Sequence, residues 1–97
     1  MEKYLEMTKP FDPAELLDSA EAIGAYLEEI FEEGDPAFIT QALGVIARAK
    51  GMTEVAKKAG LTRESLYKAL SAEGNPEFAT VLKVLSALDL KMGVRAA

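Results

Sequence analysis

Two short helical patterns separated by one glycine constrain the fold of this chain more than any other feature. They occupy residues 51–70 and are divided at Gly60, a residue type that tolerates the positive φ with which a helix ends and the chain reverses. Thr53 and Thr62 stand where the two helices would begin, and each hydroxyl can accept a hydrogen bond from a backbone N–H one turn later. The spacing predicts a helix-turn-helix, a motif whose second helix enters the major groove of DNA.

The second predicted helix separates apolar from polar side chains. Leu66 and Leu70 lie one turn apart and are expected to face the core. On the outer face, Arg63 can pair with guanine through two hydrogen bonds, Glu64 can accept one from cytosine, and Lys68 can reach a base or a phosphate. Hydroxyls near the helix start suit phosphate contacts. The DNA-binding residues predicted in this way are Thr53, Thr62, Arg63, Glu64, Ser65, Tyr67 and Lys68.

Two alternatives accompany this prediction. The charged residues could simply solvate an exposed helix, with Glu64 and Lys68 forming an ion pair across one turn. Tyr67 could touch a phosphate or a thymine methyl group, or it could pack against the loop at Asn75-Pro76. The sequence leaves both questions open.

Charge is distributed unevenly along the 97 residues, whose net charge is −5. Residues 1–40 hold eleven acids and two bases, a balance of −9, whereas residues 41–97 hold nine bases and five acids, a balance of +4. Because affinity for nucleic acid follows the charge near the phosphates, the second part is suited to DNA despite the negative total. The acidic part either faces a different partner or only aids solubility.

The residue types that are missing narrow the function further. The chain has no cysteine and no histidine, which excludes disulfides, thiolate metal sites and the commonest general base. The glutamates lack the usual partners of a metal site and no nucleophile–base pair is evident, so we expect no metal, no cofactor and no catalysis. No apolar run is long enough to cross a membrane, and the N-terminus lacks the apolar segment of a signal peptide.

Capping residues and apolar spacing divide the rest of the chain into helices. A short helical turn is expected after Asp12-Pro13, near the end of an N-terminal arm. Ser19 and Asp35 are expected to cap the next two helices, and Gly34 and Gly51 are expected to end them.

The C-terminal part continues the same pattern. Asn75-Pro76 is expected to start a last helix, which the chain leaves through a left-handed conformation at Asp89. A weak alternation of apolar and polar residues from Leu90 to Val94 indicates a short strand. The sequence therefore predicts one all-α domain of five helices with a short C-terminal strand. Its parts are an arm at 1–12, N-terminal helices in 13–50, the helix-turn-helix at 52–71, a last helix at 76–89 and the strand at 90–95.

Several stretches of the chain form a wider pattern: Ala47–Thr53, Arg63–Ser71, Gly74–Phe78 and Thr80, with Tyr26-Leu27, Gly34–Pro36 and, more loosely, Asp12-Pro13 upstream. Together they closely resemble the "probable addiction module antidote" family, lambda-repressor-like antitoxins encoded beside RelE-like toxins. The resemblance covers about residues 11–94. It implies a lambda-repressor-like fold and a cytoplasmic bacterial protein that binds DNA and represses its own operon. It also implies a partner, a small basic toxin that cleaves messenger RNA.

The chain departs from that family pattern in two places. Many lambda-repressor-like domains carry a glutamine that contacts the DNA backbone at the start of the first motif helix, where this chain has Met52. The stretch after the second motif helix, which is often basic in phage repressors, holds Glu73 and Glu77. Weaker phosphate contacts per subunit would make dimerisation or toxin-assisted DNA binding more important.

An RNA-cleaving toxin needs a basic surface to hold phosphates, and an acidic partner can cover such a surface. The acidic half of the chain is therefore expected to contact the toxin, with Tyr4, Leu5 and Phe11 as candidate apolar anchors. The alternative is that Phe11 and Leu16 cap the bundle and that the acids only solvate it. The predicted toxin-binding residues are Glu28, Glu29, Glu32 and Glu33.

A homodimer is also expected, because a two-fold operator requires two recognition helices about one DNA turn apart. Its interface would use either paired Leu90–Val94 strands or the exposed face of the last helix. Two other functions stay open: a prophage-type transcriptional regulator without a toxin, and a helical protein-binding module that no longer binds DNA. A neighbouring toxin gene would separate the first from an antitoxin, and salt-dependent binding to promoter DNA would exclude the second.

Overall fold

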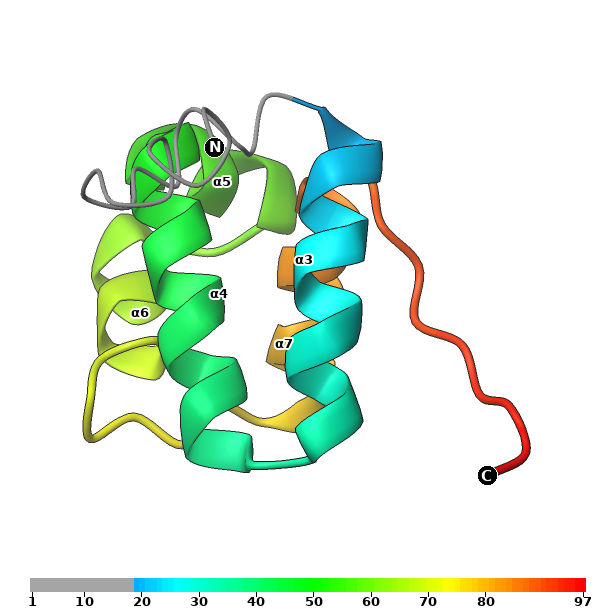
Figure 1. Ribbon diagram of the computed structural model, residues 1–97. Helices are drawn as coiled ribbons and strands as arrows, with labels where there is room; N and C mark the ends of the chain where they lie inside the picture. Colours follow the sequence, from blue (N-terminus) through cyan, green and yellow to red (C-terminus); the bar gives the residue numbers. More distant parts are fainter. Residues whose placement is uncertain (1–18) are drawn as a thin grey trace, which may run out of the picture.

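Five helices make up the part of the chain that the computed structural model describes, residues 19–97 (Figure 1). These residues contain no strand, so the all-α prediction is confirmed. In chain order the helices are α3 (Ala20–Glu33), α4 (Pro36–Lys50), α5 (Met52–Ala59), α6 (Arg63–Ala69) and α7 (Phe78–Ala87). The expected arm at 1–12, the turn at Asp12-Pro13 and the apolar residues Tyr4, Leu5, Phe11 and Leu16 lie outside the described residues.

The capping residues predicted for α3 and α4 act as expected. Ser19 Oγ accepts a hydrogen bond from the Ala22 N–H at 3.1 Å, and the Asp35 carboxylate accepts one from the Ala37 N–H at 3.0 Å. Gly34 ends α3 in the left-handed conformation, with φ 72°. These caps satisfy backbone N–H groups that the first turn of a helix leaves unpaired, and they fix where both helices begin.

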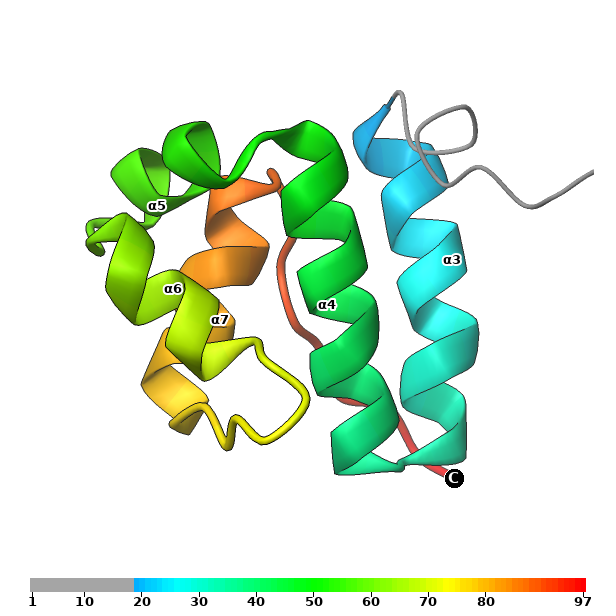
Figure 2. The same cartoon turned by 90° about the vertical axis from the view of Figure 1, so that its left-hand side faces the viewer.

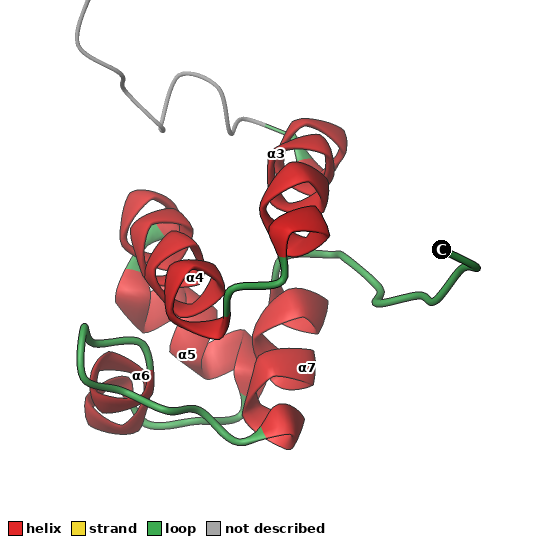
Figure 3. Ribbon diagram, turned by 60° about the horizontal axis from the view of Figure 1, so that its bottom comes forward, coloured by secondary structure: helices red, strands yellow, loops and turns green. Residues whose placement is uncertain are grey.

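The helices form a bundle in which α5 packs against α4, α6 and α7. Helices α3 and α4 run antiparallel side by side, and α4 also packs against α5 (Figures 1 and 2). Helix α5 in turn packs against α6 and α7. As a result, α6 and α3 lie on opposite sides of the molecule (Figures 1 and 3).

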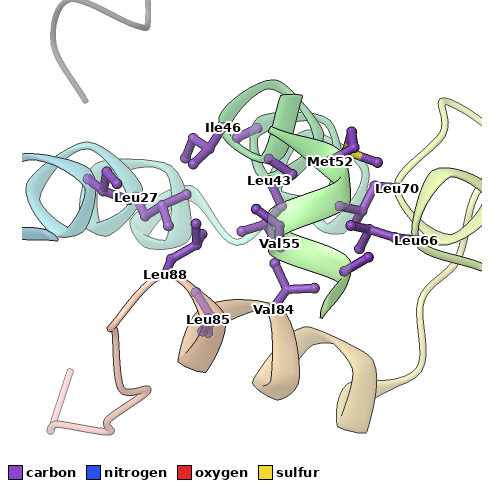
Figure 4. Close-up of a cluster of buried hydrophobic side chains, with 14 of the residues drawn as sticks. Leu27, Leu43, Ile46, Met52, Val55, Leu66, Leu70, Val84, Leu85 and Leu88 are labelled. Atoms are coloured by element: carbon purple, nitrogen blue, oxygen red, sulfur yellow. The ribbon is translucent and has the colours of Figure 1, made fainter. Parts of the chain in front are cut away.

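All five helices contribute apolar side chains to one core (Figure 4). Leu27 of α3, Val55 of α5 and Leu85 of α7 meet there, and no polar side chain among the described residues is buried with them. Such burial is the main stabilising contribution in a small bundle. The largest fully buried side chains are Ile23, Leu43, Ile46, Leu66 and Val84.

The structure corrects the predicted cap of α5. The helix begins at Met52, its flanking residue is Gly51 with φ 106°, and no side chain caps it, so Thr53 is not the N-cap. Met52 is buried in the core, with 5% of its surface exposed. Its packing draws the chain into the helix two residues earlier than predicted and places Thr53 on the exposed side of the first turn.

The last helix is also shorter than predicted. It begins at Phe78 rather than Pro76, because Glu77 is still extended (φ −64°, ψ 153°), and no side chain caps it. The extended residues before it connect the end of α6 to the start of α7 (Figure 2). The predicted exit is confirmed, since Asp89 adopts φ 63°.

The predicted strand at 90–95 is wrong, because this segment is irregular. No strand within residues 19–97 is available to pair with it, and an isolated strand would leave its backbone groups without a ladder. The segment instead starts with Leu90 packed against the core and continues alongside α3 (Figure 1).

Candidate nucleic-acid interface

Local hydrogen bonds set the start of α6. Helix α5 ends at Gly60, whose φ of 73° turns the chain, and the Gly60 N–H reaches the carbonyl of Lys57 at 3.2 Å. Thr62 then acts as the N-cap of α6, and its hydroxyl accepts from the Ser65 N–H at 3.0 Å. This cap was predicted, and it fixes the direction in which α6 leaves the turn.

Helix α6 is held by a narrow apolar strip and exposes the rest of its surface. Leu66, its only buried residue, has no exposed surface, and Leu70 just beyond its end is 3% exposed. Every predicted DNA-binding residue on the helix is exposed, so the structure brings them together on one short outer surface. These residues are Arg63, Glu64, Ser65, Tyr67 and Lys68.

Arg63 and Tyr67 order each other across one turn of α6. Arg63 Nη2 donates a hydrogen bond to Tyr67 Oη at 3.5 Å, and Arg63 Cζ lies 5.4 Å from the centre of the ring. The hydrogen bond to Tyr67, together with the charge interactions with Tyr67 and Glu64, raises the pKa of Arg63 above its ordinary value. The guanidinium, which is always charged in proteins, is thus directed along the exposed side of the helix.

Lys68 is not paired with an acid on its own helix. Both ion pairs found within residues 19–97 involve Arg95, so the pair between Glu64 and Lys68 that the alternative interpretation included does not form. The ammonium group of Lys68 is thus available to an external anion.

Three residues of α5 are also exposed near or within the predicted interface. Thr53 is exposed in the first turn of α5, so of the predicted residues it alone lies outside α6 and its cap. Lys57 and Lys58 are exposed in the last turn of α5, directly before the turn, and were not among the predicted residues. Helices α5 and α6 together hold four bases and two acids.

The acidic surface lies on α3, on the opposite side of the bundle (Figure 1). This helix holds five glutamates and no base, and the four predicted toxin-binding residues on it are all exposed. Arg95 bonds two of them: its Nη1 lies 3.4 Å from Glu28 Oε2 and its Nη2 lies 3.2 Å from Glu32 Oε1. Arg95 was not predicted to contribute, because it is 63 residues or more from both partners and no sequence spacing joins them.

Neither a metal site nor a membrane span is found among the described residues. None of their acidic groups is arranged to hold a metal ion. None of their helices is long and apolar enough to cross a membrane.

Comparison with known proteins gives one family. A family model described as "Probable addiction module antidote protein" matches residues 7–96. A Haemophilus influenzae protein described only as "Uncharacterized protein" is 53% identical over 90 residues, which cover 93% of each chain. No solved structure matches the chain.

Proposed function

The chain belongs to the probable addiction module antidote protein family, and from that premise we propose that it is a DNA-binding antitoxin. In this proposal it represses its own operon and neutralises a RelE-like toxin by direct binding. The DNA-binding part rests on α6 and its cap, and the toxin-binding part rests on the acidic surface of α3. The two helices lie on opposite sides of the bundle (Figure 3), which supports the proposal that both partners bind at once.

The observation that carries the DNA-binding proposal is the outer surface of α6. A helix of seven residues is anchored by Leu66 and presents five polar side chains, all exposed. It follows shortly after the last turn of α5, which bears Lys57 and Lys58. A helix placed in this way can enter the major groove with its first turn toward the base edges.

Each side chain has a role that follows from its chemistry. Arg63 reads guanine through two hydrogen bonds, and its contact with Tyr67 reduces the number of conformations it loses on binding. Lys68 contacts phosphate, and Thr53, Thr62 and Ser65 offer hydroxyls or N–H groups to the backbone. Glu64 accepts from cytosine and disfavours other bases at that position.

Repression also requires a homodimer, because one subunit presents a single recognition helix. The predicted strand interface is unsuited, since residues 90–95 form no strand. Helix α7 offers the second candidate surface: Phe78 and Leu82, one turn apart, are 65% and 40% exposed. Two such faces would bury apolar surface on pairing and set the spacing between the two α6 helices.

DNA binding can be tested with the promoter region of the gene that encodes this chain. Binding of wild-type protein is measured by fluorescence anisotropy at several salt concentrations. We expect Arg63→Ala to weaken binding about 5- to 150-fold and to relax preference at one base pair. Lys68→Ala is expected to weaken binding to all sequences and to reduce the salt slope by about one unit.

Matched controls lie on the other side of the bundle. Arg95→Ala and Lys91→Ala remove the same charges from the C-terminal segment and are expected to leave the affinity nearly unchanged. If Arg63→Ala and Lys68→Ala bind as wild type does, α6 is not in the groove. If wild-type protein shows no salt-dependent binding, the chain is a protein-binding module rather than a repressor.

Toxin binding is tested by copurification with the product of the neighbouring reading frame. A stable complex that suppresses that product's RNA cleavage supports the antitoxin proposal. DNA binding without such a complex would favour a prophage-type regulator.

A further inference from the structure

A cleft is lined by α3 and by the C-terminal segment, residues 89–97. This segment runs alongside α3 (Figure 1). The volume of the cleft is about 1080 Å³, at the upper end of the range of small-molecule clefts, so a peptide segment fits in it. Apolar side chains from both walls line it, among them Leu27, Phe31, Met92 and Val94. The carboxylates of Glu28 and Glu32 stand at its edge.

The C-terminal wall of this cleft is attached to the bundle at its two ends. At the near end, the Leu90 N–H bonds to the Leu85 carbonyl at 2.9 Å, and the Leu90 side chain packs beside Gly24 of α3. At the far end, Arg95 bridges the two glutamates. Between these points, Met92 is 37% exposed and Val94 is 99% exposed. Val94 therefore contributes almost no packing that would hold the segment closed.

The ion pairs that Arg95 forms with Glu28 and Glu32 are easily replaced by those of another cation. The side chains of Arg95, Glu28 and Glu32 are each about 70% exposed, and ion pairs in such positions contribute little to stability. The two glutamates lie one turn apart and together accept one guanidinium group. A cation from another molecule can take the place of Arg95 at small cost.

The negative charge of α3 indicates which kind of molecule can bind in the cleft. A nucleic acid is disfavoured by the five glutamates of α3, and a second copy of the chain would bring two such helices together. A basic protein segment has the complementary charge, and the apolar lining favours aliphatic or aromatic residues beside its cation.

We propose that this cleft binds an apolar segment of the toxin that carries an arginine or lysine. The incoming cation replaces Arg95 on Glu28 and Glu32, and the apolar residues of the toxin segment pack against Met92, Val94 and the α3 wall. Arg95 then acts as an internal competitor that covers the glutamate pair in the free protein. This inference rests on the proposed antitoxin function and narrows its toxin site from the four predicted glutamates to Glu28 and Glu32, which line the cleft; Glu29 and Glu33 lie outside it.

The test compares two pairs of glutamates on the same helix. Glu28→Gln/Glu32→Gln and Glu29→Gln/Glu33→Gln remove the same charge from α3, but only the first pair lines the cleft. Affinity for the product of the neighbouring reading frame is measured by calorimetry with full-length protein at physiological salt. We expect the first variant to weaken the complex about 10-fold or more and the second to change it less than about 3-fold. All four positions are exposed, so circular dichroism should show that both variants fold.

Arg95→Ala supplies a readout of the opposite sign. Removing the internal competitor is expected to tighten the complex by up to about 5-fold. Equal losses in the two glutamate variants, or weaker binding by Arg95→Ala, would overturn the cleft as the toxin site while leaving the antitoxin function in place. Absence of binding by wild-type protein would overturn both.

Discussion

At the α6 end of the molecule, polar side chains are ordered by neighbours three or four residues away. Thr62 caps the helix through Ser65, and Arg63 contacts Tyr67. At the α3 end, the ordering contact is the bridge from Arg95, which joins residues more than sixty positions apart. Local contacts form with the helix itself, whereas the bridge exists only when the C-terminal segment lies along α3.

This difference matches the two proposed roles. A DNA-reading surface benefits from side chains that are already oriented, because less conformational freedom is lost on binding. A surface that an internal segment covers and releases benefits from a weak contact that a partner can replace. The predictions below test whether the two ends differ in this way, beginning with the largest effect.

Leu66→Ala should be the most damaging change at the α6 end. Leu66 is fully buried and is the only buried residue of α6. The substitution leaves a cavity and should lower the free energy of unfolding by about 2–5 kcal/mol. Denaturant unfolding followed by circular dichroism measures the loss. A cost below about 1 kcal/mol would mean that α6 keeps its place without this anchor, and the contrast between the two ends would lose its basis.

Replacing two glycines inside helices by alanine should change the stability of the protein in opposite directions. At Gly44 of α4, an added Cβ would lie 2.9 Å from the Leu70 carbonyl oxygen, at the end of α6. Backbone must shift there, so we expect Gly44→Ala to destabilise by about 1–2 kcal/mol despite the better helix propensity of alanine.

At Gly24 of α3, an added Cβ would meet only the tip of the Leu90 side chain, at 3.4 Å. The flexible tip can move, so Gly24→Ala should stabilise the protein by up to about 1 kcal/mol. Thermal unfolding of both variants checks the pair. Destabilisation by Gly24→Ala would show that the C-terminal segment is packed on α3 as firmly as α6 is packed on α4.

Replacing each of the two threonines of the motif by alanine should also have different effects on stability. Thr62 accepts the capping hydrogen bond, and its replacement by alanine should cost about 1 kcal/mol. Thr53 caps nothing, so Thr53→Ala should change stability by less than about 0.5 kcal/mol. Unfolding free energies measured side by side decide the point. Equal losses of unfolding free energy in the two variants would indicate that Thr53 caps α5, as its sequence position suggested.

Some helix boundaries could be predicted from the sequence and others could not. The ends of α3 and α4 and the cap of α6 followed from residues within one turn, because Ser19, Asp35 and Thr62 act on their own neighbours. The start of α5 did not, because burial of Met52 outweighed the capping tendency of Thr53.

The C-terminal segment shows the same limit more clearly. The left-handed exit at Asp89 was predicted correctly, since it is a property of one residue. Alternation from Leu90 to Val94 then indicated a strand, but a strand needs a partner and none lies within residues 19–97. The bridge of Arg95 to Glu28 and Glu32 depends on how the bundle folds back, which no local pattern encodes.

Arg95→Ala should have a small effect on stability, and it tests the contrast most directly. Both of its ion pairs are exposed to solvent, so together they should contribute less than about 1 kcal/mol at low salt and less still at high salt. Unfolding is measured at both salt concentrations, with Lys91→Ala as the control that removes a charge without an ion pair in the structure. A loss above about 1 kcal/mol that persists in high salt would make the C-terminal segment part of the core fold. The cleft beside α3 could then not open at small cost, and the two ends of the molecule would be held with similar firmness.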